Sequence, residues 1–326
     1  MEIVKKIIQE NKGFIKPLLI PAEYMIGPSI SNPSIFNFNG IILVNLRNLN
    51  YILYHSEKNL HEHIWGPLLY VHPEDDQTLT THNIFCELTD DLSIKKYSRI
   101  DTSKLDVEPI WEFVGLEDGR IVIWENKLFL TGVRRDTTPN GIGRMELSQL
   151  SIEDGHHVKE IHRERIPAPF PDTTYCEKNW MPILDRPYHF VKWTNPTEVV
   201  KYCPESKTTE TVSLTPYQNF NTSDLRGGSQ VIRYQDKYLA VLHEVALYSS
   251  PLKKKDGSYF HRFCLWDENF NLIKVSPRFN FLGAKIEFTC GLCEKNDDFL
   301  ITFGFQDNAA FVLSVKKDFI MDFIHE

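Results

Sequence analysis

The stretch Glu117–Arg134, EDGRIVIWENKLFLTGVR, contains the pattern that decides the fold. Polar residues open an apolar run, a turn at Asn126-Lys127 follows, and a second apolar run ends on a cation. Two short apolar, β-branched runs on either side of such a turn predict an antiparallel β-hairpin. In a hairpin the start of the first strand and the end of the second strand lie at the same edge. We therefore expect the polar residues at both ends of this stretch to lie close together.

The same unit occurs five times along the 326 residues. The five turns, each with its second strand, are Asn39-Gly40 with Ile41–Arg47, Asn126-Lys127 with Leu128–Arg134, Asp185-Arg186 with Tyr188–Trp193, Asp236-Lys237 with Tyr238–His243, and Asp297-Asp298 with Phe299–Phe305. One unit is too small to bury its own faces, and such repeats are typical of radial arrays. The sequence therefore predicts an all-β fold, a five-bladed β-propeller, and leaves a β-sandwich as the alternative.

The N-terminal segment differs from the rest of the chain. Ile3, Val4, Ile7 and Ile8 have helical spacing, which predicts a short helix. We expect residues 1–24 to form an N-terminal helical extension and residues 25–326 to form a single propeller domain.

Composition narrows the class of protein. A net charge of −8 argues against a non-specific nucleic-acid binder. No apolar run is long enough for a membrane span, and the N-terminus lacks a signal-peptide pattern. Six scattered cysteines suggest reduced thiols and a cytoplasmic protein. No spacing of ligands predicts a metal site or a cofactor, since Cys290 and Cys293 lie within an apolar strand. Whether the chain forms a homo-oligomer stays open.

The adjacent acids Glu117 and Asp118 are the strongest chemical signal. Consecutive strand residues face opposite sides, so we expect only one of the two to reach the rim while the other orients a loop or an arginine. A partly buried carboxyl at such a place can act as a general acid. The alternative is a pair of turn acids that cap backbone amides.

The segment Glu177-Lys178-Asn179-Trp180 is the second signal. Lysine suits a phosphate group, and an indole ring suits the apolar face of a sugar. The alternative is structural, with Lys178 paired to Glu177 and Trp180 in the core.

Other charged residues fall at the same places in the repeat. They are Arg47, Arg120, Arg134, Arg135 and His243 as cations, and Glu244, Glu287 and Asp307 as acids. Taken alone, each is more readily explained as a salt-bridged surface residue. Their common position in the repeat is what predicts a site.

In chain order these motifs resemble those of the β-mannoside phosphorylases (glycoside hydrolase family 130) and the related β-mannosyltransferases. The residues that carry the resemblance are Asn32-Pro33, Leu46-Arg47, Glu117–Ile121, Lys178-Asn179, Gly227-Gly228 with Leu242–Glu244, and Phe288–Gly291 with Phe303-Gly304 and Asp307. The chain departs from the family pattern at Gly119, where the family has proline, and at Glu244, where it has glycine. Trp180 and Glu287 have no clear counterpart.

The resemblance implies a five-bladed propeller that transfers a glycosyl group with inversion. By position Asp118 is the general acid, Arg47, Lys178 and His243 hold phosphate, and Asn32 and Asp307 bind the sugar. Further candidates follow from their expected position at the rim. Glu117 is a catalytic candidate, and Arg120 and Arg134 are phosphate-binding candidates. Asn179 and Trp180 are sugar-binding candidates. The expected substrate is a carbohydrate together with phosphate or a nucleotide sugar.

Two alternatives stay open. In an inverting hydrolase, Glu244 or Glu287 would activate water about 6.5–9.5 Å from Asp118. In a propeller that only binds glycans or proteins, ion pairs would neutralise the rim acids and side chains would fill the centre.

Overall fold

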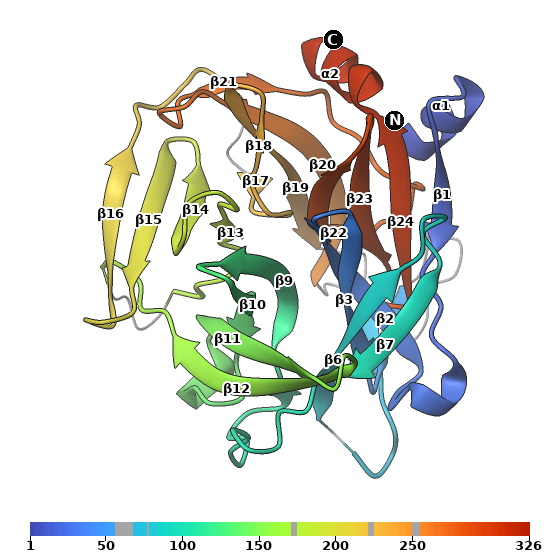
Figure 1. Ribbon diagram of the computed structural model, residues 1–326, viewed down its shortest axis with the longest axis vertical. Coiled ribbons are helices and arrows are strands. Elements are labelled where there is room, and N and C mark those ends of the chain that lie inside the picture. The colour runs from blue at the N-terminus through green and yellow to red at the C-terminus, as the bar shows by residue number, and fades with distance from the viewer. Residues whose placement is uncertain (56–67, 77, 171–174, 221–224, 250–254) are drawn as a thin grey trace.

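The computed structural model describes the chain except residues 56–67, 77, 171–174, 221–224 and 250–254. Its strands form five antiparallel blades around one axis (Figure 1). The predicted five-bladed β-propeller is confirmed, and so is the short N-terminal helix, α1 (Ile3–Gln9). The helices in the described part of the chain are too short or too polar to cross a membrane.

The first three blades each have four main strands, which follow one another from the axis outward. Blade 1 has β2 (Ser29–Phe38), β3 (Ile41–Leu49), β6 (Leu79–Leu88) and β7 (Ile94–Arg99), with β8 (Phe113–Val114) also paired to β6. Blade 2 has β9 (Glu117–Trp124), β10 (Lys127–Arg134), β11 (Arg144–Glu153) and β12 (His157–Arg165). Blade 3 has β13 (Met181–Pro182), β14 (His189–Thr194), β15 (Thr197–Cys203) and β16 (Thr208–Leu214).

The last two blades depart from this simple order. In blade 4 the inner position is shared by β17 (Leu225–Arg226) and β18 (Ile232–Tyr234), followed by β19 (Lys237–Ser249), β20 (Lys255–Trp266) and β21 (Leu272–Val275). Blade 5 has β22 (Glu287–Lys295), β23 (Asp298–Phe305), β24 (Ala309–Lys316) and then β1 (Gly13–Pro17).

Strand β1 closes the ring, because it pairs with β24 from the opposite end of the chain. The expected boundary at residue 24 leaves this strand out of the propeller, although it is the outer strand of blade 5. The sequence analysis also missed a C-terminal helix, α2 (Lys317–His325), which packs into the same core as α1. The two ends of the chain meet, with Lys6 Nζ 2.6 Å from Glu326 Oε1.

The hairpins form where the sequence predicted them. Asn39, Asn126 and Asn296 occupy their turns with φ between 50° and 59°, a conformation that asparagine tolerates better than most residues. The apolar strand residues pack between neighbouring blades, for example Trp124 of blade 2 against Phe190 of blade 3.

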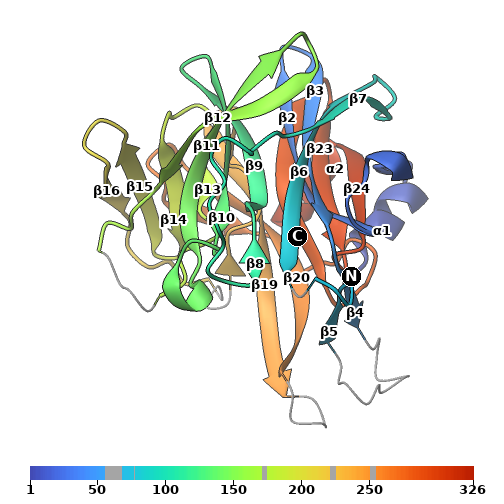
Figure 2. The ribbon, with the colours of Figure 1, turned by 90° about the horizontal axis from the view of Figure 1, so that it is seen from below.

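Two hairpins extend beyond one face of the propeller (Figure 2). One is the insertion β4 (Ile52–His55) with β5 (Leu68–Val71) in blade 1, and the other is the far end of β19 and β20 in blade 4. Asn308 in blade 5 holds the first hairpin by bonding both the N–H and the carbonyl of Leu53, at 3.3 and 3.1 Å.

The side chain of Gln230 links inner strands of different blades. Its Nε2 donates to the carbonyls of Ile35 in blade 1 (2.9 Å) and Ile121 in blade 2 (3.0 Å). Its Oε1 accepts from the N–H of Leu292 in blade 5 (3.2 Å). One fully buried side chain from blade 4 therefore ties together the inner strands of three other blades.

Candidate active site

In three successive blades a residue of left-handed backbone lies at or near the start of the inner strand. Asn32, Asp118 and Asn179 have φ of 42°, 52° and 61°. The β2–β3 and β9–β10 pairings are also irregular beside Asn32 and Asp118. Asparagine and aspartate are the non-glycine residues that visit this conformation most readily. At these three positions the left-handed backbone therefore interrupts the regular alternation of side chains along the strand.

Asp118 accepts two hydrogen bonds from blade 1 on the same oxygen. Asn32 Nδ2 lies 2.9 Å and Arg47 Nη1 lies 2.6 Å from its Oδ1. Burial alone would raise the pKa of Asp118, but Arg47, Arg120 and the Asn32 hydrogen bond outweigh it and lower the pKa. Asp118 is therefore ionised in the free protein.

Glu117 lies near the same arginine as Asp118, namely Arg47. Its Oε2 is 3.9 Å from Arg47 Nη2, and its Oε1 is 3.1 Å from Arg135 Nε. The two acids do not point fully apart, because the left-handed backbone at Asp118 breaks the regular alternation of the strand. Glu117 does hold a neighbouring arginine, Arg135, as expected for one of the two acids. Burial raises the pKa of Glu117 and outweighs the nearby arginines, so the two neighbouring carboxyls differ in acidity.

Arginine side chains beside Asp118 keep unused N–H groups. Arg47 also donates to Thr81 Oγ1 (3.1 Å), and Arg120 donates to the carbonyls of Gly228 (2.7 Å) and Asp118 (2.9 Å). Arg47 Nε and Arg120 Nη2 are buried without a hydrogen-bond partner among the described residues. Buried donors without partners cost free energy, so this arrangement suits an anionic ligand.

Asp307 is the third carboxyl of the cluster. Its Oδ1 accepts from Ser31 Oγ at 2.8 Å. Burial raises its pKa, against the opposing effect of Arg47. Asp307 also raises the pKa of Tyr70 and of Tyr259, each to about 12, after burial as the larger cause. These two tyrosines come from the two hairpins that project from the propeller face.

His243 and Lys178 complete the group. His243 Nδ1 lies 2.9 Å from the carbonyl of Gly227, and its ring lies parallel to that of Tyr259. Burial, His261 and Lys178 lower the pKa of His243, which makes it neutral and a donor to Gly227. Lys178 is exposed, lowers the pKa values of Asp118 and His243, and has no ion pair or hydrogen bond within the described ranges.

Four of the residues singled out from the sequence are engaged elsewhere. Glu244 pairs with Arg262 (2.8 Å) and with Arg278, on the side of β19 opposite His243. Glu287 accepts backbone N–H groups of the loop that precedes it, at 2.6, 2.8 and 3.0 Å. Both acids are thus occupied in holding structure.

Arg134 and Trp180 are also structural in their surroundings. Arg134 is buried between Glu146 and Asp136, at 2.6 and 3.1 Å. Trp180 is a core residue with 1% of its surface exposed, and its Nε1 donates to Glu177 (2.9 Å). Trp180 therefore lies in the core, as the structural alternative expected. Glu177, however, accepts from the indole of Trp180 and is not paired with Lys178.

Asn179 is buried, and its Oδ1 has no hydrogen-bond partner within the described ranges. Its carbonyl approaches Gly227, where a Cβ would lie only 1.8 Å from that oxygen. Sequence reasoning did not single out Tyr70, Tyr259 or Gln230. Only Gln230 had a nearby signal, since it follows the Gly227-Gly228 pair.

No family model matches the sequence, and no curated protein matches it either. Among solved structures, the β-1,2-mannobiose phosphorylase from Listeria innocua aligns over 96% of this chain and 99% of its own, with a TM-score of 0.56 and 14% identity. A mannose phosphorylase from Leishmania mexicana, solved with a phosphate ion, aligns over 98% of this chain and 93% of its own, with a TM-score of 0.54 and 12% identity. The chain shares the fold of these enzymes. The resemblance expected from the motifs is confirmed at that level.

A GDP-Man-dependent mannosyltransferase from Leishmania mexicana is similar to the same degree. It aligns over 97% of this chain and 95% of its own, with a TM-score of 0.54 and 12% identity. One propeller fold thus holds both phosphorylases and a nucleotide-sugar-dependent transferase.

Proposed function

We propose that the chain is a carbohydrate-active enzyme that transfers a glycosyl group, with inversion, to or from a phosphate-bearing group. The proposal rests on the following observation. An ionised Asp118 lies close to N–H donors of Arg47, Arg120 and Lys178 that have no partner among the described residues. The donors suit phosphoryl oxygens, and the carboxylate suits proton transfer at a sugar hydroxyl.

The cluster carries more positive than negative charge. Arg47, Arg120, Arg135 and Lys178 face three carboxyls, and two of those, Glu117 and Asp307, have raised pKa values. A phosphate or diphosphate group would balance this excess. His243 is neutral and so adds a hydrogen-bonding nitrogen rather than a charge.

The low pKa of Asp118 sets its role in each direction of transfer. As a carboxylate it accepts a proton from the incoming hydroxyl, whose oxygen bonds to the anomeric carbon while the phosphate-bearing group leaves with the bonding electron pair. In the reverse direction a phosphate oxygen attacks that carbon, and protonated Asp118 gives its proton to the departing sugar oxygen. By resemblance, this proton passes through a hydroxyl of the sugar.

Mannose-type sugars are the proposed substrates, because the similar structures include two mannoside phosphorylases and a mannosyltransferase. Hydrolysis receives less support, since Glu244 and Glu287 are both held by other groups. A purely binding role is disfavoured, because it predicts that ion pairs neutralise the rim. Guanidinium donors of Arg47 and Arg120 instead lack hydrogen-bond partners among the described residues.

Asp118→Asn is the decisive variant. We expect turnover to fall about 10²–10⁴-fold, because the amide keeps a similar shape but cannot exchange the proton. The assay incubates the protein with mannose 1-phosphate, GDP-mannose or manno-oligosaccharides plus phosphate, and measures release of phosphate or nucleotide, or formation of sugar phosphate. The product released distinguishes a transferase from a phosphorylase.

The matched control is Glu244→Gln, an equally small change at an acid bound to Arg262 and Arg278. It is expected to retain turnover within a few-fold. Equal turnover of Asp118→Asn and wild type, with the fold intact by circular dichroism, removes the proposed proton carrier. Release of free mannose from oligosaccharides without phosphate would support hydrolysis instead.

A further inference from the structure

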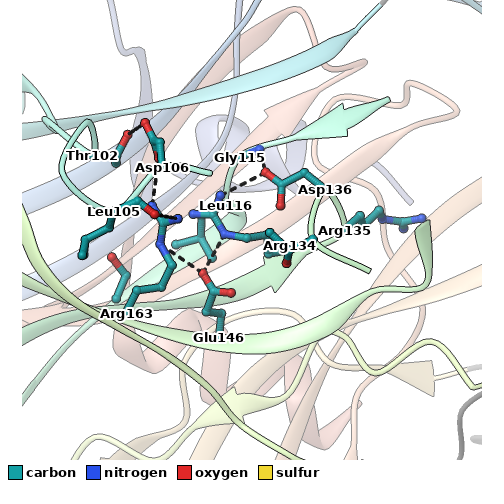
Figure 3. A network of polar contacts seen from close by, with 12 residues as sticks. Thr102, Leu105, Asp106, Gly115, Leu116, Arg134, Arg135, Asp136, Glu146 and Arg163 are labelled. Carbon is teal, nitrogen blue, oxygen red and sulfur yellow. Dashed lines mark hydrogen bonds and ion pairs between the residues drawn. The ribbon is translucent and has the colours of Figure 1, made fainter. Parts of the chain in front are cut away.

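A second group of buried charges lies between blades 1 and 2 (Figure 3). Arg134 contacts Glu146 and Asp136, and Arg163 bonds Glu160 through Nη2 at 2.5 Å. Arg163 Nε also lies 3.5 Å from Glu146, which joins the two arginines into one network. The proposed transfer reaction does not use these residues.

The buried part of this network lacks one positive charge. The side chains of Asp136, Glu146 and Glu160 are 6%, 4% and 1% exposed. Among the described residues they pair with two buried guanidinium groups, those of Arg134 and Arg163. Burial raises the pKa of Glu146 and outweighs the attraction of Arg134. Uncompensated buried charge is costly, so a proton or another cation must supply the difference.

Other titratable groups near the network do not supply it. Asp106 bonds Arg163 but its side chain is 53% exposed, so water solvates its charge. Burial and Arg99 lower the pKa of His82, which is therefore neutral.

A cavity of about 230 Å³ adjoins these charges and is lined in part by Asp136, Arg134, Glu160 and Arg163. Asp136 Oδ1 is buried and has no hydrogen-bond partner among the described residues. The cavity has room for an ion with several waters.

The cavity has an approach from outside. It shares His82, Ile100, Thr102 and Asp106 with an adjoining groove of about 1060 Å³. The cavity that Asp136 lines therefore adjoins a groove open to solvent.

We propose that this cavity binds one small monovalent cation of the size of Na⁺, K⁺ or ammonium, with Asp136 Oδ1 as its principal protein ligand. A single charge is what the network lacks. A tightly coordinated divalent ion fits less well, because the described residues include no group of three or more His, Cys, Asp or Glu side chains that could hold a metal ion. Hydroxyl groups of the lining, such as that of Thr81, offer further oxygen atoms.

The site is connected to the catalytic strand. Asp136 Oδ2 accepts from the N–H of Gly115 at 2.8 Å, two residues before Glu117. Thr81, which lines the cavity, accepts from Arg47. A bound cation would thus stabilise the entry to β9 as well as the network.

The test is thermal unfolding of the whole protein at about pH 8 in NaCl, KCl or NH₄Cl, against choline chloride at equal ionic strength. Choline is too large for a site built around one carboxylate oxygen. At least one small cation is expected to raise Tm by about 2–4 °C over choline, with saturation. Equal Tm values in all four salts overturn the proposal.

Two isosteric variants locate the effect. Asp136→Asn and Glu146→Gln each remove the extra negative charge, and each should abolish the difference between salts. A difference that persists in both folded variants places the ion elsewhere and also overturns the proposal.

Wild-type protein alone provides a further check if neither variant folds. Acid favours protonation of Glu146, which supplies the missing charge, so the salt difference should be smaller at the lowest pH at which the protein stays folded than at pH 8. A salt difference that stays the same at both pH values contradicts a site built on this network.

Discussion

Asp118 depends on its backbone for its partners. With φ of 52° its carboxyl meets Arg47 and Asn32 of the neighbouring blade, while the adjacent Glu117 reaches the same arginine. A residue held in this sparsely populated region is stable only where its surroundings fix it, and such residues occur often at functional sites. Four polar side chains, two from blade 1 and two from blade 2, are thus brought together.

Asp307 is expected to lower stability at neutral pH. Its pKa is raised from 3.8, so the folded state favours the protonated form. The stability that it contributes is present below that ordinary value and is lost as the pH rises through the folded pKa. Asp307→Asn, which keeps an acceptor for Ser31, should therefore gain stability relative to wild type as the pH rises from roughly 4 to 7.

Urea unfolding of both proteins across this range measures the effect. The gain should grow as the pH rises toward neutral, which is the direction that the raised pKa of Asp307 gives. A variant that loses stability relative to wild type on raising the pH would show that Asp307 is stabilised as a carboxylate, with a lowered rather than a raised pKa.

At the residue scale the sequence predicted where the polar groups lie but not what they bond. Asn32 and Arg47 bond Asp118, and Lys178 is near enough to lower its pKa, so these four residues do lie close together. Glu287 has an equivalent place, yet its partners are amides of a loop with no pattern of its own. Hydrogen-bond partners distant in sequence cannot be deduced from position in a repeat alone.

Between elements, glycines set how closely strands of neighbouring blades approach. At Gly304 in blade 5 a Cβ would lie 2.2 Å from Asn32 Oδ1 and 2.6 Å from Asn32 N in blade 1. Asn32 in turn donates to Asp118, so the spacing of blades 5 and 1 is transmitted to the proposed proton carrier.

Gly304→Ala should displace Asn32. We expect an activity loss of about 10²-fold, since small misplacements of reacting groups have effects of that size, and a loss of about 1–3 kcal/mol in unfolding free energy. The measurements are the glycosyl transfer assay and urea unfolding.

Gly155→Ala is the control at this scale. It lies in an outer turn with φ of 73° and no atom within 4 Å of an added Cβ, so it should cost about 1–2 kcal/mol through backbone strain and leave activity unchanged. Equal activity losses in both variants would argue that instability, not the position of Asn32, causes the effect.

For the whole molecule, ring closure depends on β1. Lys316 N–H donates to the carbonyl of Lys12 (2.8 Å), and Leu18 N–H donates to that of Ala310 (2.9 Å). Since hydrogen-bonded pairs alternate along an antiparallel ladder, Phe14 also turns its N–H toward β24. Its side chain is 47% exposed. Comparing substitutions at Phe14 therefore separates the contribution of its backbone N–H to stability from that of its side chain.

Phe14→Pro should therefore destabilise the protein more than Phe14→Ala. Proline removes one ladder donor, and we expect a difference of about 1–3 kcal/mol in unfolding free energy, measured with urea. Equal stability of the two variants would mean that β1 is not needed to hold the ring closed.

The number of blades followed from the repeated hairpins, but the way the ring closes did not. Gly13–Pro17 has no hairpin partner next to it in the sequence, because its partner is Ala309–Lys316 at the other end of the chain. A repeat reveals what successive units share. It contains no signal for a strand that belongs to the last unit and comes first in the chain.

Gln230 makes the positions of the blades depend on one another. Because one amide bonds backbone groups of Ile35, Ile121 and Leu292, a shift of any of these three strands strains its bonds to the other two. Strands β2 and β9 also carry Asn32 and Asp118, so loosening this link should loosen the proposed proton carrier as well.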